Sequence, residues 1–373
     1  MRVILTGGGT GGHIYPALAI ADKIKEREPD SEILYIGNEM GIEKEIVPAA
    51  GYEFRMVPAR WLERRKNKLD YFCQLGLTGA VTCGGTAKAL SIMRKFRPDA
   101  VIGTGGFVCV PVVLAGKMYG ARTFIHEQNA FPGAANRLLS KYADRIFLGF
   151  SEGGEYFGCP EKLVYTGNPV RKDFLGITRE EARKLLNIPE DSFTVFSFGG
   201  SMGSETINSI AVRIIKEVNG KEGWNVIAGT GSAHYDEIVE ELKSSGIETA
   251  DNIDIRPYIR DMHVCMNGAD VVIGRAGALS VAETTICGRA AVFVPYPEAT
   301  GNHQYFNAKA IAEAGGAILA EEKDLDVDEV AERIKALKDN REELEAMSRA
   351  SLSCSPKGAT DKIYEEIKET LQK

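Results

Sequence analysis

The sequence has few cysteines and no pattern that would use them together. Its seven cysteines are odd in number, scattered along the chain, and never arranged as C-x-x-C. This spacing argues against a disulfide framework and against a zinc site, and it favours a reducing compartment. Long hydrophobic runs are also missing, because no window reaches the ~18 uninterrupted apolar residues of a membrane-spanning helix. We therefore expect a cytoplasmic chain that is neither secreted nor membrane-spanning.

Composition and length indicate a globular protein with two domains. Hydrophobic residues make up 44% of the chain and charged residues 26%, which is ordinary for a protein that buries a full core. A chain of 373 residues exceeds the size at which one hydrophobic core keeps growing. We expect two domains of ordinary size, with a cleft available between them.

Short β-branched runs alternate with longer helical patterns in both halves of the chain. Runs flanked on both sides by helices predict buried parallel strands in an open α/β sheet. A glycine-rich turn follows the first strand of each half, so the two halves have the same local pattern. The turn signal Gly167-Asn168-Pro169 lies between them and predicts the linker. The fold class predicted is α/β, with two Rossmann-like domains in tandem. The predicted strands are Val3–Leu5, Ile33–Ile36, Ala100–Ile102, Thr123–Ile125, Arg145–Leu148, Thr194–Phe198, Asn225–Ala228, Asp254–Pro257, Val271–Ile273, Ala291–Val294 and Ala317–Leu319.

The two glycine-rich turns predict binding of a diphosphate. A glycine turn that opens a helix brings backbone N–H groups and the positive helix end close to a phosphate. Gly7-x-Gly9-x-x-Gly12 matches the dinucleotide fingerprint, but the second strand ends in Gly37-Asn38 without the acidic residue that would hold a ribose. Neither turn is a Walker A sequence. Diphosphate binding at two places remains, with ligand-free strand-to-helix turns as the alternative.

A second signal follows the run Val271–Ile273, in the segment Arg275–Glu283. Its small residues would allow a ligand close to the backbone, and Glu283 could accept hydrogen bonds from a ribose diol. The competing interpretation is a capping box, since Ser280-x-x-Glu283 is also the pattern of a helix start. Arg171 could pair with a diphosphate, and a surface ion pair is its alternative.

One basic segment stands out in a chain of net charge −7. Between Arg55 and Arg97 there are ten Lys or Arg and two acidic residues, interleaved with bulky apolar side chains. Such a mixture is typical of a surface that meets anionic lipid. The alternative is a solvated helix face over core residues, because charge runs are usually exposed faces. Nucleic acid is disfavoured as a partner, because the chain is acidic overall and has no recognition motif.

Six sequence blocks, taken in order, resemble those of the MurG family of glycosyltransferases over nearly the whole chain. The resemblance implies a GT-B fold, with parallel sheets facing a central cleft, and transfer of N-acetylglucosamine to undecaprenyl-pyrophosphoryl-muramoyl-pentapeptide in peptidoglycan synthesis. It also implies an acceptor domain, 1–166 plus a returning C-terminal helix 357–373, and a donor domain, 167–356. The blocks are Gly8-Gly9-Thr10-Gly11-Gly12-His13, His126-Glu127-Gln128-Asn129, Gly167-Asn168-Pro169-Val170-Arg171, Gly199-Gly200-Ser201-x-Gly203, Gly277-Ala278-Leu279-Ser280-Val281-Ala282-Glu283 and His303-Gln304-Tyr305-Phe306-Asn307-Ala308.

The same resemblance assigns site residues by position. Glu283 would hold the ribose, Ile259 would lie against uracil, and Arg171 with Ser201 would hold the diphosphate. His303 replaces a glutamine common in the family, so Gln304 is the better sugar contact of the two. The other implied donor residues are Thr10, Gly11, Gly12, Asn129, Ala278, Leu279, Ser280, Val281 and Ala282. The acceptor pyrophosphate would meet Gly8, Gly9, Gly103, Gly105 and Gly106. The membrane patch would comprise Trp61, Arg64, Arg65, Lys66, Lys68, Phe72 and Leu75, on the cytoplasmic face of the cell membrane.

The chemistry calls for a general base and for charge stabilisation on the leaving group. An inverting transfer is a single displacement in which a base takes the proton of the acceptor hydroxyl. His13, near a predicted helix N-terminus, and Glu127, at a strand end, are the two candidates. The acidic run Asp324-x-Asp326-x-Asp328 is expected to mark a helix start, so neither a metal nor a cofactor is expected. The alternatives are a UDP-N-acetylglucosamine 2-epimerase and a non-catalytic UDP-sugar binding protein.

Overall fold

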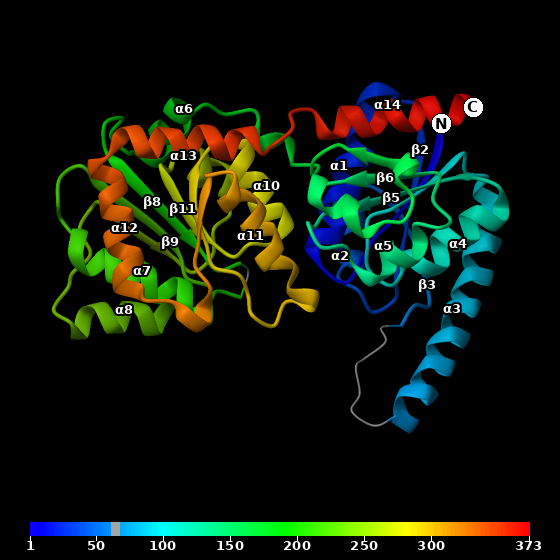
Figure 1. The fold of residues 1–373 in the computed structure, drawn as a ribbon, viewed down its shortest axis with the longest axis horizontal. Coiled ribbons are helices and arrows are strands. Elements are labelled where there is room, and N and C mark those ends of the chain that lie inside the picture. The colour runs from blue at the N-terminus through cyan, green and yellow to red at the C-terminus, as the bar shows by residue number, and fades with distance from the viewer. Residues whose placement is uncertain (61–67, 201) are drawn as a thin grey trace. The chain divides into compact units, whose positions relative to one another are not determined.

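The structure is a computed structural model that describes residues 1–60, 68–200 and 202–373. The chain forms two compact units (Figure 1). The N-terminal unit is Met1–Val170 together with Gly358–Lys373, and the C-terminal unit is Arg171–Lys357. The structural boundaries therefore lie at 170/171 and 357/358, within four residues of those suggested by the sequence.

The N-terminal unit is built on a parallel sheet of seven strands. Its five central strands are short, mostly aliphatic runs that are buried except at some of their end residues, because helices cover both faces of the sheet. In sheet order the strands are β3 (Glu53–Val57), β2 (Glu32–Asn38), β1 (Arg2–Thr6), β4 (Ala100–Gly103), β5 (Arg122–Glu127), β6 (Arg145–Leu148) and β7 (Leu163–Tyr165). The helices are α1 (Gly11–Arg27), α2 (Glu43–Ala49), α3 (Lys68–Phe96), α4 (Cys109–Tyr119), α5 (Ala134–Leu139) and α14 (Ala359–Gln372).

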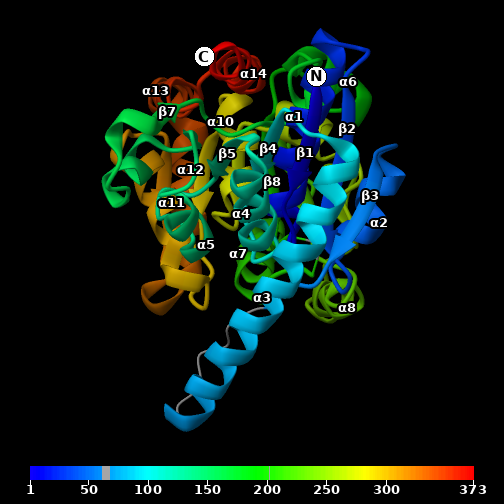
Figure 2. The same cartoon turned by 90° about the vertical axis from the view of Figure 1, so that its right-hand side faces the viewer.

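The two strands that sequence patterning missed, β3 and β7, are the edge strands of this sheet. β3 contains Glu53 and Arg55 and is half exposed, while β7 is only three residues long. An edge strand pairs on one side only, so it needs no continuous aliphatic run. The first half of α3 extends beyond the rest of the N-terminal unit (Figure 2).

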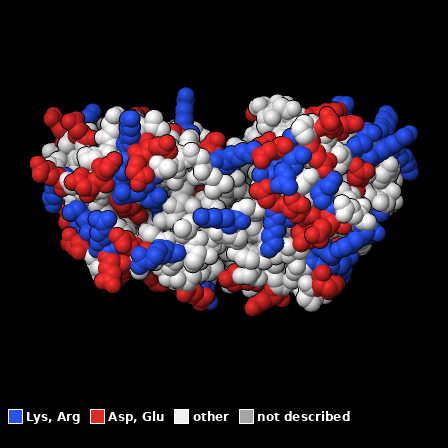
Figure 3. Space-filling view, turned by 90° about the horizontal axis from the view of Figure 1, so that it is seen from above, with Lys and Arg blue, Asp and Glu red and all other residues white. Residues whose placement is uncertain are grey.

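The C-terminal helix α14 packs against α1 in the N-terminal unit. Ile363 and Ile367 are fully buried in this contact. Ion pairs flank the apolar contact, and acidic and basic side chains alternate on the face that carries α14 (Figure 3). These pairs are Lys23–Asp361, Arg27–Asp361, Arg27–Glu365 and Lys368–Glu28.

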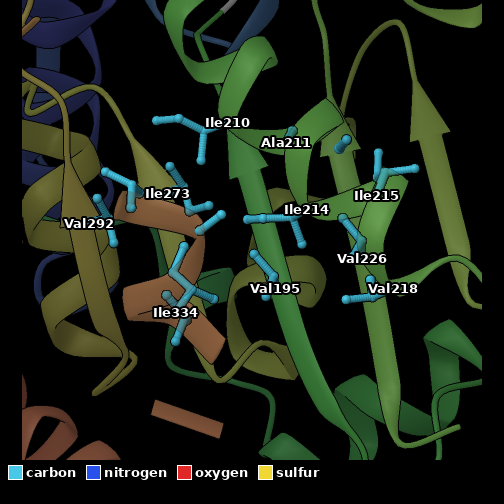
Figure 4. Packing of buried hydrophobic residues seen from close by; sticks show 14 of the residues in the cluster. Val195, Ile210, Ala211, Ile214, Ile215, Val218, Val226, Ile273, Val292 and Ile334 are labelled. Atoms are coloured by element: carbon cyan, nitrogen blue, oxygen red, sulfur yellow. The ribbon is translucent and has the colours of Figure 1, made fainter. Parts of the chain in front are cut away.

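The C-terminal unit repeats the same architecture with a parallel sheet of six strands. Its core lies between the sheet and α7 and α12, where Val195, Ile214, Ile273 and Ile334 are in one buried cluster (Figure 4). In sheet order the strands are β10 (Ile253–Arg256), β9 (Trp224–Gly229), β8 (Phe193–Phe198), β11 (Val271–Gly274), β12 (Ala290–Phe293) and β13 (Ala317–Leu319). The helices are α6 (Arg179–Leu186), α7 (Glu205–Val218), α8 (Tyr235–Ser244), α9 (Met262–Gly268), α10 (Ala278–Ile286), α11 (His303–Glu313), α12 (Val327–Asp339) and α13 (Arg341–Ser353).

Both sheets reverse their strand order next to their first strand. In the N-terminal unit β1 lies between β2 and β4, and in the C-terminal unit β8 lies between β9 and β11. In open parallel sheets, ligands bind beyond the carboxyl ends of the strands at such a switch point. The glycine turns after β1 and β8 lie at these two positions, so the topology brings each predicted diphosphate loop to the binding edge of its own sheet.

Candidate active site

In the N-terminal unit, two glycine loops meet at the carboxyl ends of β1 and β4. The first loop is Gly7–Gly12 and the second is Gly103–Gly106. The Gly8 N–H donates to the Gly105 carbonyl at 3.2 Å, so part of the first loop's donor capacity is already used. Gly103 is the last residue of β4, and a Cβ there would lie 2.9 Å from Val113. The predicted acceptor glycines are therefore adjacent, but Gly103 faces helix α4.

His13 lies in the first turn of α1, beside both glycine loops. Its Nδ1 is 2.9 Å from the carbonyl oxygen of Gly8. A carbonyl can only accept, so the proton of this hydrogen bond is on Nδ1 and Nε2 is the basic nitrogen. A Cβ on Gly105 would lie 2.6 Å from the ring, and Gly105 has φ +109. Thr10, Gly11 and Gly12 precede the ring at the start of the same helix.

Glu127 ends β5, and its buried carboxylate accepts four hydrogen bonds. The donors are the backbone and the side-chain amide of Asn129 at 3.0 and 3.1 Å, Gly133 N at 3.0 Å and Asn136 Nδ2 at 2.9 Å. These contacts fill the lone-pair sites that a carboxylate offers. Glu127 thereby fixes the loop that carries Asn129. Burial lowers the pKa of its neighbour His126 to about 4, so that ring is neutral.

In the C-terminal unit, the glycine loop Gly199–Gly203 connects β8 to α7. Gly200 and Gly203 have φ +87 and +81, a conformation that favours glycine. Ser204 caps α7 by accepting from Ile207 N at 3.4 Å. Ser201, predicted to hold the diphosphate, lies outside the described residues.

Arg171 and Glu283 form an ion pair in the C-terminal unit, with 3.3 Å between Arg171 Nη2 and Glu283 Oε1. Burial raises the pKa of Glu283 to about 7, although Arg171 opposes the shift. The capping-box interpretation of Ser280 and Glu283 is wrong. α10 begins at Ala278 with Gly277 as its N-cap and no side-chain cap, so Ser280 and Glu283 lie inside the helix. Glu283 therefore does not cap the helix, and its carboxylate can contact a ligand.

A cavity of about 180 Å³ opens between the glycine loop and this ion pair. Its volume is below the ~300–1,000 Å³ of pockets that enclose a whole drug-sized ligand, so it suits one part of a larger ligand. Position 229 accommodates only glycine, because the Cβ of any other residue would lie 2.6 Å from Ile259 Cγ1. The lining residues are Phe198, Gly200, Gly229, Gly231, Pro257, Tyr258, Ile259, Met262, Ser280 and Glu283.

The cavity brings together Ile259, Ser280 and Glu283 from the residues predicted by sequence. It also contains Phe198, Gly229, Tyr258 and Met262, which sequence reasoning missed. No motif marks them, because they come from the ends of strands β8 and β9 and from the segment after β10.

The remaining predicted donor residues lie near the carboxyl ends of β11 and β12. Ala278, Val281 and Ala282 are buried in α10, whereas Leu279 is half-buried. Gln304 is the second residue of α11, and its Oε1 accepts from Tyr296 N at 3.0 Å. The Gln304 NH₂ group is the end that can donate to a ligand.

Neither a metal cluster nor a spanning helix occurs in the part of the chain that the structure describes. No group of His, Cys, Asp or Glu among residues 1–60, 68–200 and 202–373 could hold a metal ion. Asp326 caps α12 by accepting from Asp328 N and Glu329 N, so the prediction that this acidic run marks a helix start is confirmed. None of the described helices combines the length and apolar character needed to cross a bilayer.

The predicted membrane patch falls largely outside the description. Trp61, Arg64, Arg65 and Lys66 lie outside the described residues. Lys68, Phe72 and Leu75 belong to α3, and their side chains lie outside the described set as well.

Comparison with known proteins shows which protein families this chain resembles. Residues 3–148 match the glycosyltransferase family 28 N-terminal domain, and residues 194–366 match the glycosyltransferase family 28 C-terminal domain. A UDP-N-acetylglucosamine–N-acetylmuramyl-(pentapeptide) pyrophosphoryl-undecaprenol N-acetylglucosamine transferase from Desulforudis audaxviator is 42% identical, covering 100% of this chain and 99% of its own length.

Solved structures are similar over the same extent. MurG of Acinetobacter baumannii has a TM-score of 0.77 and 25% identity, covering 99% of both chains. A UDP-GlcNAc 2-epimerase from Neisseria meningitidis has a TM-score of 0.69 but only 13% identity, covering 99% of this chain and all of its own, which shows a shared fold alone. With both family domains matched and full-length relatives at about 40% identity, the chain belongs to glycosyltransferase family 28 and, within it, to the MurG N-acetylglucosamine transferases.

Proposed function

We propose that this chain transfers N-acetylglucosamine from UDP-N-acetylglucosamine to the C4 hydroxyl of undecaprenyl-pyrophosphoryl-N-acetylmuramoyl-pentapeptide, converting lipid I to lipid II. The observation that carries the proposal is the cavity at the switch point of the C-terminal unit, with Ile259, Ser280 and Glu283 in its wall. Labelled UDP-N-acetylglucosamine and the lipid-linked acceptor should yield a labelled lipid product. Binding of the nucleotide sugar without turnover on authentic acceptor would favour a non-catalytic binding protein.

The C-terminal unit is proposed to hold the donor. Ile259 lies against the uracil ring, and Glu283 accepts hydrogen bonds from the ribose diol. Arg171 and the glycine loop before α7 face the diphosphate. The positive end of α7 and the Arg171 guanidinium stabilise the charge that develops on departing UDP. Gln304, with Ala278 and Leu279, surrounds the sugar end of the donor.

Replacing Glu283 with glutamine should weaken UDP-N-acetylglucosamine binding at nearly unchanged melting temperature. The carboxylate would lose charge-assisted hydrogen bonds to the ribose worth about 1.5–3 kcal/mol. Titration calorimetry of both proteins measures the change. A fall in stability without a fall in affinity would leave Glu283 a purely structural residue.

The pKa of Glu283 adds a pH dependence to this result. Because its pKa is raised to about 7, the carboxyl is mostly neutral below that pH and loses the charge that strengthens its hydrogen bonds from the two hydroxyls. Donor affinity should therefore rise between pH 6 and pH 8 in the unmodified protein and stay flatter in the Glu283→Gln variant. The sign for stability is the opposite: a raised carboxyl pKa favours the folded state at low pH, and this contribution is lost as pH rises toward 7.

The N-terminal unit is proposed to hold the acceptor and to supply the base. The glycine loops Gly7–Gly12 and Gly103–Gly106 would receive the acceptor pyrophosphate, with Asn129 and Thr10 reaching the donor sugar. His13 Nε2 takes the proton of the attacking hydroxyl. The bond to the anomeric carbon forms as the bond to the UDP oxygen breaks, so the configuration at that carbon inverts.

The 2-epimerase alternative rests on the shared fold and on a shared nucleotide sugar. Incubation with UDP-N-acetylglucosamine alone distinguishes the two enzymes, since an epimerase would form UDP-N-acetylmannosamine without any acceptor. A transferase would leave the donor unchanged over the same time.

The segment Arg55–Arg97 is proposed to bind the cytoplasmic face of the membrane, where the lipid anchor of the acceptor lies. Reversing the charges of Arg64, Arg65, Lys66 and Lys68 should weaken binding to anionic vesicles by about 1 kcal/mol per charge. Vesicle sedimentation at low salt measures the effect, and a water-soluble acceptor should still react normally. Unchanged vesicle binding would identify the segment as a solvated surface.

A further inference from the structure

One peptide group connects His13 to a buried carboxylate. The Gly8 carbonyl accepts the hydrogen bond from His13 Nδ1 at 2.9 Å. The N–H of the same peptide unit belongs to Gly9, and it donates to Glu43 Oε2 at 3.2 Å. Carboxylate, peptide and imidazole thus form a continuous hydrogen-bonded series within the N-terminal unit.

Glu43 is placed in space that small residues leave for it. It is the first residue of α2 and is fully buried, and its second oxygen accepts from Asn38 N at 2.9 Å. A Cβ at Gly8, Gly37 or Gly41 would come within 2.1–2.6 Å of the Glu43 side chain. Both carboxylate oxygens meet N–H donors, which is the arrangement that an ionised carboxylate requires.

The other buried titratable side chains around this peptide, Tyr35 and Cys109, are neutral, whereas the charged ones are exposed. Tyr35 donates to the Gly7 carbonyl at 2.8 Å, and burial raises its pKa well above the usual value. Burial raises the pKa of Cys109 to about 12. On α2, Lys44 and Glu45 are exposed, and Glu39 in the preceding loop pairs with a lysine of α3 at 3.2 Å. Glu43 therefore supplies the charge at the Gly8–Gly9 peptide.

We propose that Glu43 is a positioning residue that acts on His13 through the Gly8–Gly9 peptide. The inference rests on the proposed function, in which His13 is the general base. Hydrogen bonds in series polarise one another, so the carboxylate makes the Gly8 carbonyl a stronger acceptor and Nε2 a stronger base. In serine proteases a carboxylate contacts the histidine directly and performs the same two tasks, fixing the tautomer and stabilising the imidazolium. Here a peptide unit stands between the two.

The proton balance is simple. The acceptor hydroxyl proton moves to Nε2 while its oxygen bonds to the anomeric carbon and UDP leaves with the electrons of the broken bond. The Nδ1 proton stays in its hydrogen bond to Gly8, and Glu43 remains ionised. The imidazolium later releases the Nε2 proton to water.

Kinetics of Glu43→Gln provide the first test. We expect kcat to fall by about 10- to 100-fold, by analogy with the loss of the hydrogen-bonded partner behind a metal-ligating histidine. The acidic limb of the pH–rate profile should move to lower pH, and the affinity for UDP-N-acetylglucosamine should be unchanged. Glu45→Gln, an exposed carboxylate on the same helix, is the matched control and should change none of these.

Nitrogen-detected NMR of His13 provides the second test and needs no turnover. In the unmodified protein the neutral ring should carry its proton on Nδ1, and in Glu43→Gln the ring should titrate at lower pH. If Nε2 carries the proton, the proposal is overturned even when the variant fails to fold. A folded variant with an unmoved pH limb overturns it too, because Glu43 would then only shape the loop. Absence of transferase activity would overturn the proposed function and leave the NMR result standing.

Discussion

Replacing His13 with alanine is expected to lower kcat by about 10²–10⁴-fold while UDP-N-acetylglucosamine binding stays largely intact. The ring stands between the two glycine loops, and its contact with Gly8 assigns the proton to Nδ1. Nε2 is then the nitrogen that can take the proton of the acceptor hydroxyl. Steady-state rates across pH should also lose the acidic limb that His13 contributes. Donor affinity is measured separately by calorimetry.

A second substitution at the same position separates basicity from loop structure. His13→Asn keeps an N–H donor for the Gly8 carbonyl but offers no basic nitrogen, so its kcat should be as low as that of His13→Ala. His263→Ala, against Phe174 in the C-terminal unit, is a control that should retain full activity. If His13→Ala keeps nearly full kcat and Glu127→Ala loses it, the base is Glu127. The four hydrogen bonds that Glu127 accepts argue for a fixed structural carboxylate instead.

Replacing Arg183 with methionine is expected to destabilise the C-terminal unit by about 3–5 kcal/mol. Arg183 is 1% exposed on α6, and its guanidinium pairs with Asp270 at 2.7 Å. Its other donors reach the carbonyls of Gly268, Pro189, Glu190 and Ser192. Methionine fills much of the volume but removes the buried hydrogen bonds to the Gly268 and Ser192 carbonyls, and a buried polar group that loses its donor is costly.

Scanning calorimetry measures this loss as a lower melting temperature. For a unit of this size the shift should be about 6–20 °C. Arg213→Met is the control, because Arg213 forms surface pairs with Glu217 and Asp328, and exposed pairs contribute about 0–1 kcal/mol. Equal shifts of melting temperature in the two variants would contradict the inference that the buried hydrogen bonds of Arg183 stabilise the C-terminal unit.

Sequence patterning located the central strands of both sheets and the edge strands β10 and β13, but it missed β3 and β7, the edge strands of the N-terminal sheet. Runs such as Val271–Ile273 are buried on both faces, so their composition alone marks them as strands. β3 and β7 pair on one side and carry no such mark. The Ser280–Glu283 spacing matches the pattern of a capping box, but the two residues do not form one. Helix α10 begins two residues before Ser280, and the Glu283 carboxylate is buried.

The sequence by itself determined the fold class, the glycine turns after the first strand of each half, and the family, because each of these depends on local pattern or on the order of blocks along the chain. Only the tertiary structure decided which residues meet. Glu43 reaches Gly9 because β2 is adjacent to β1, and Gly229 reaches Ile259 because β9 is adjacent to both β8 and β10. The proton position on His13 likewise follows from a carbonyl that the folded loop places at 2.9 Å. Contacts between neighbouring parallel strands join residues far apart in sequence, and no local pattern encodes such a distance.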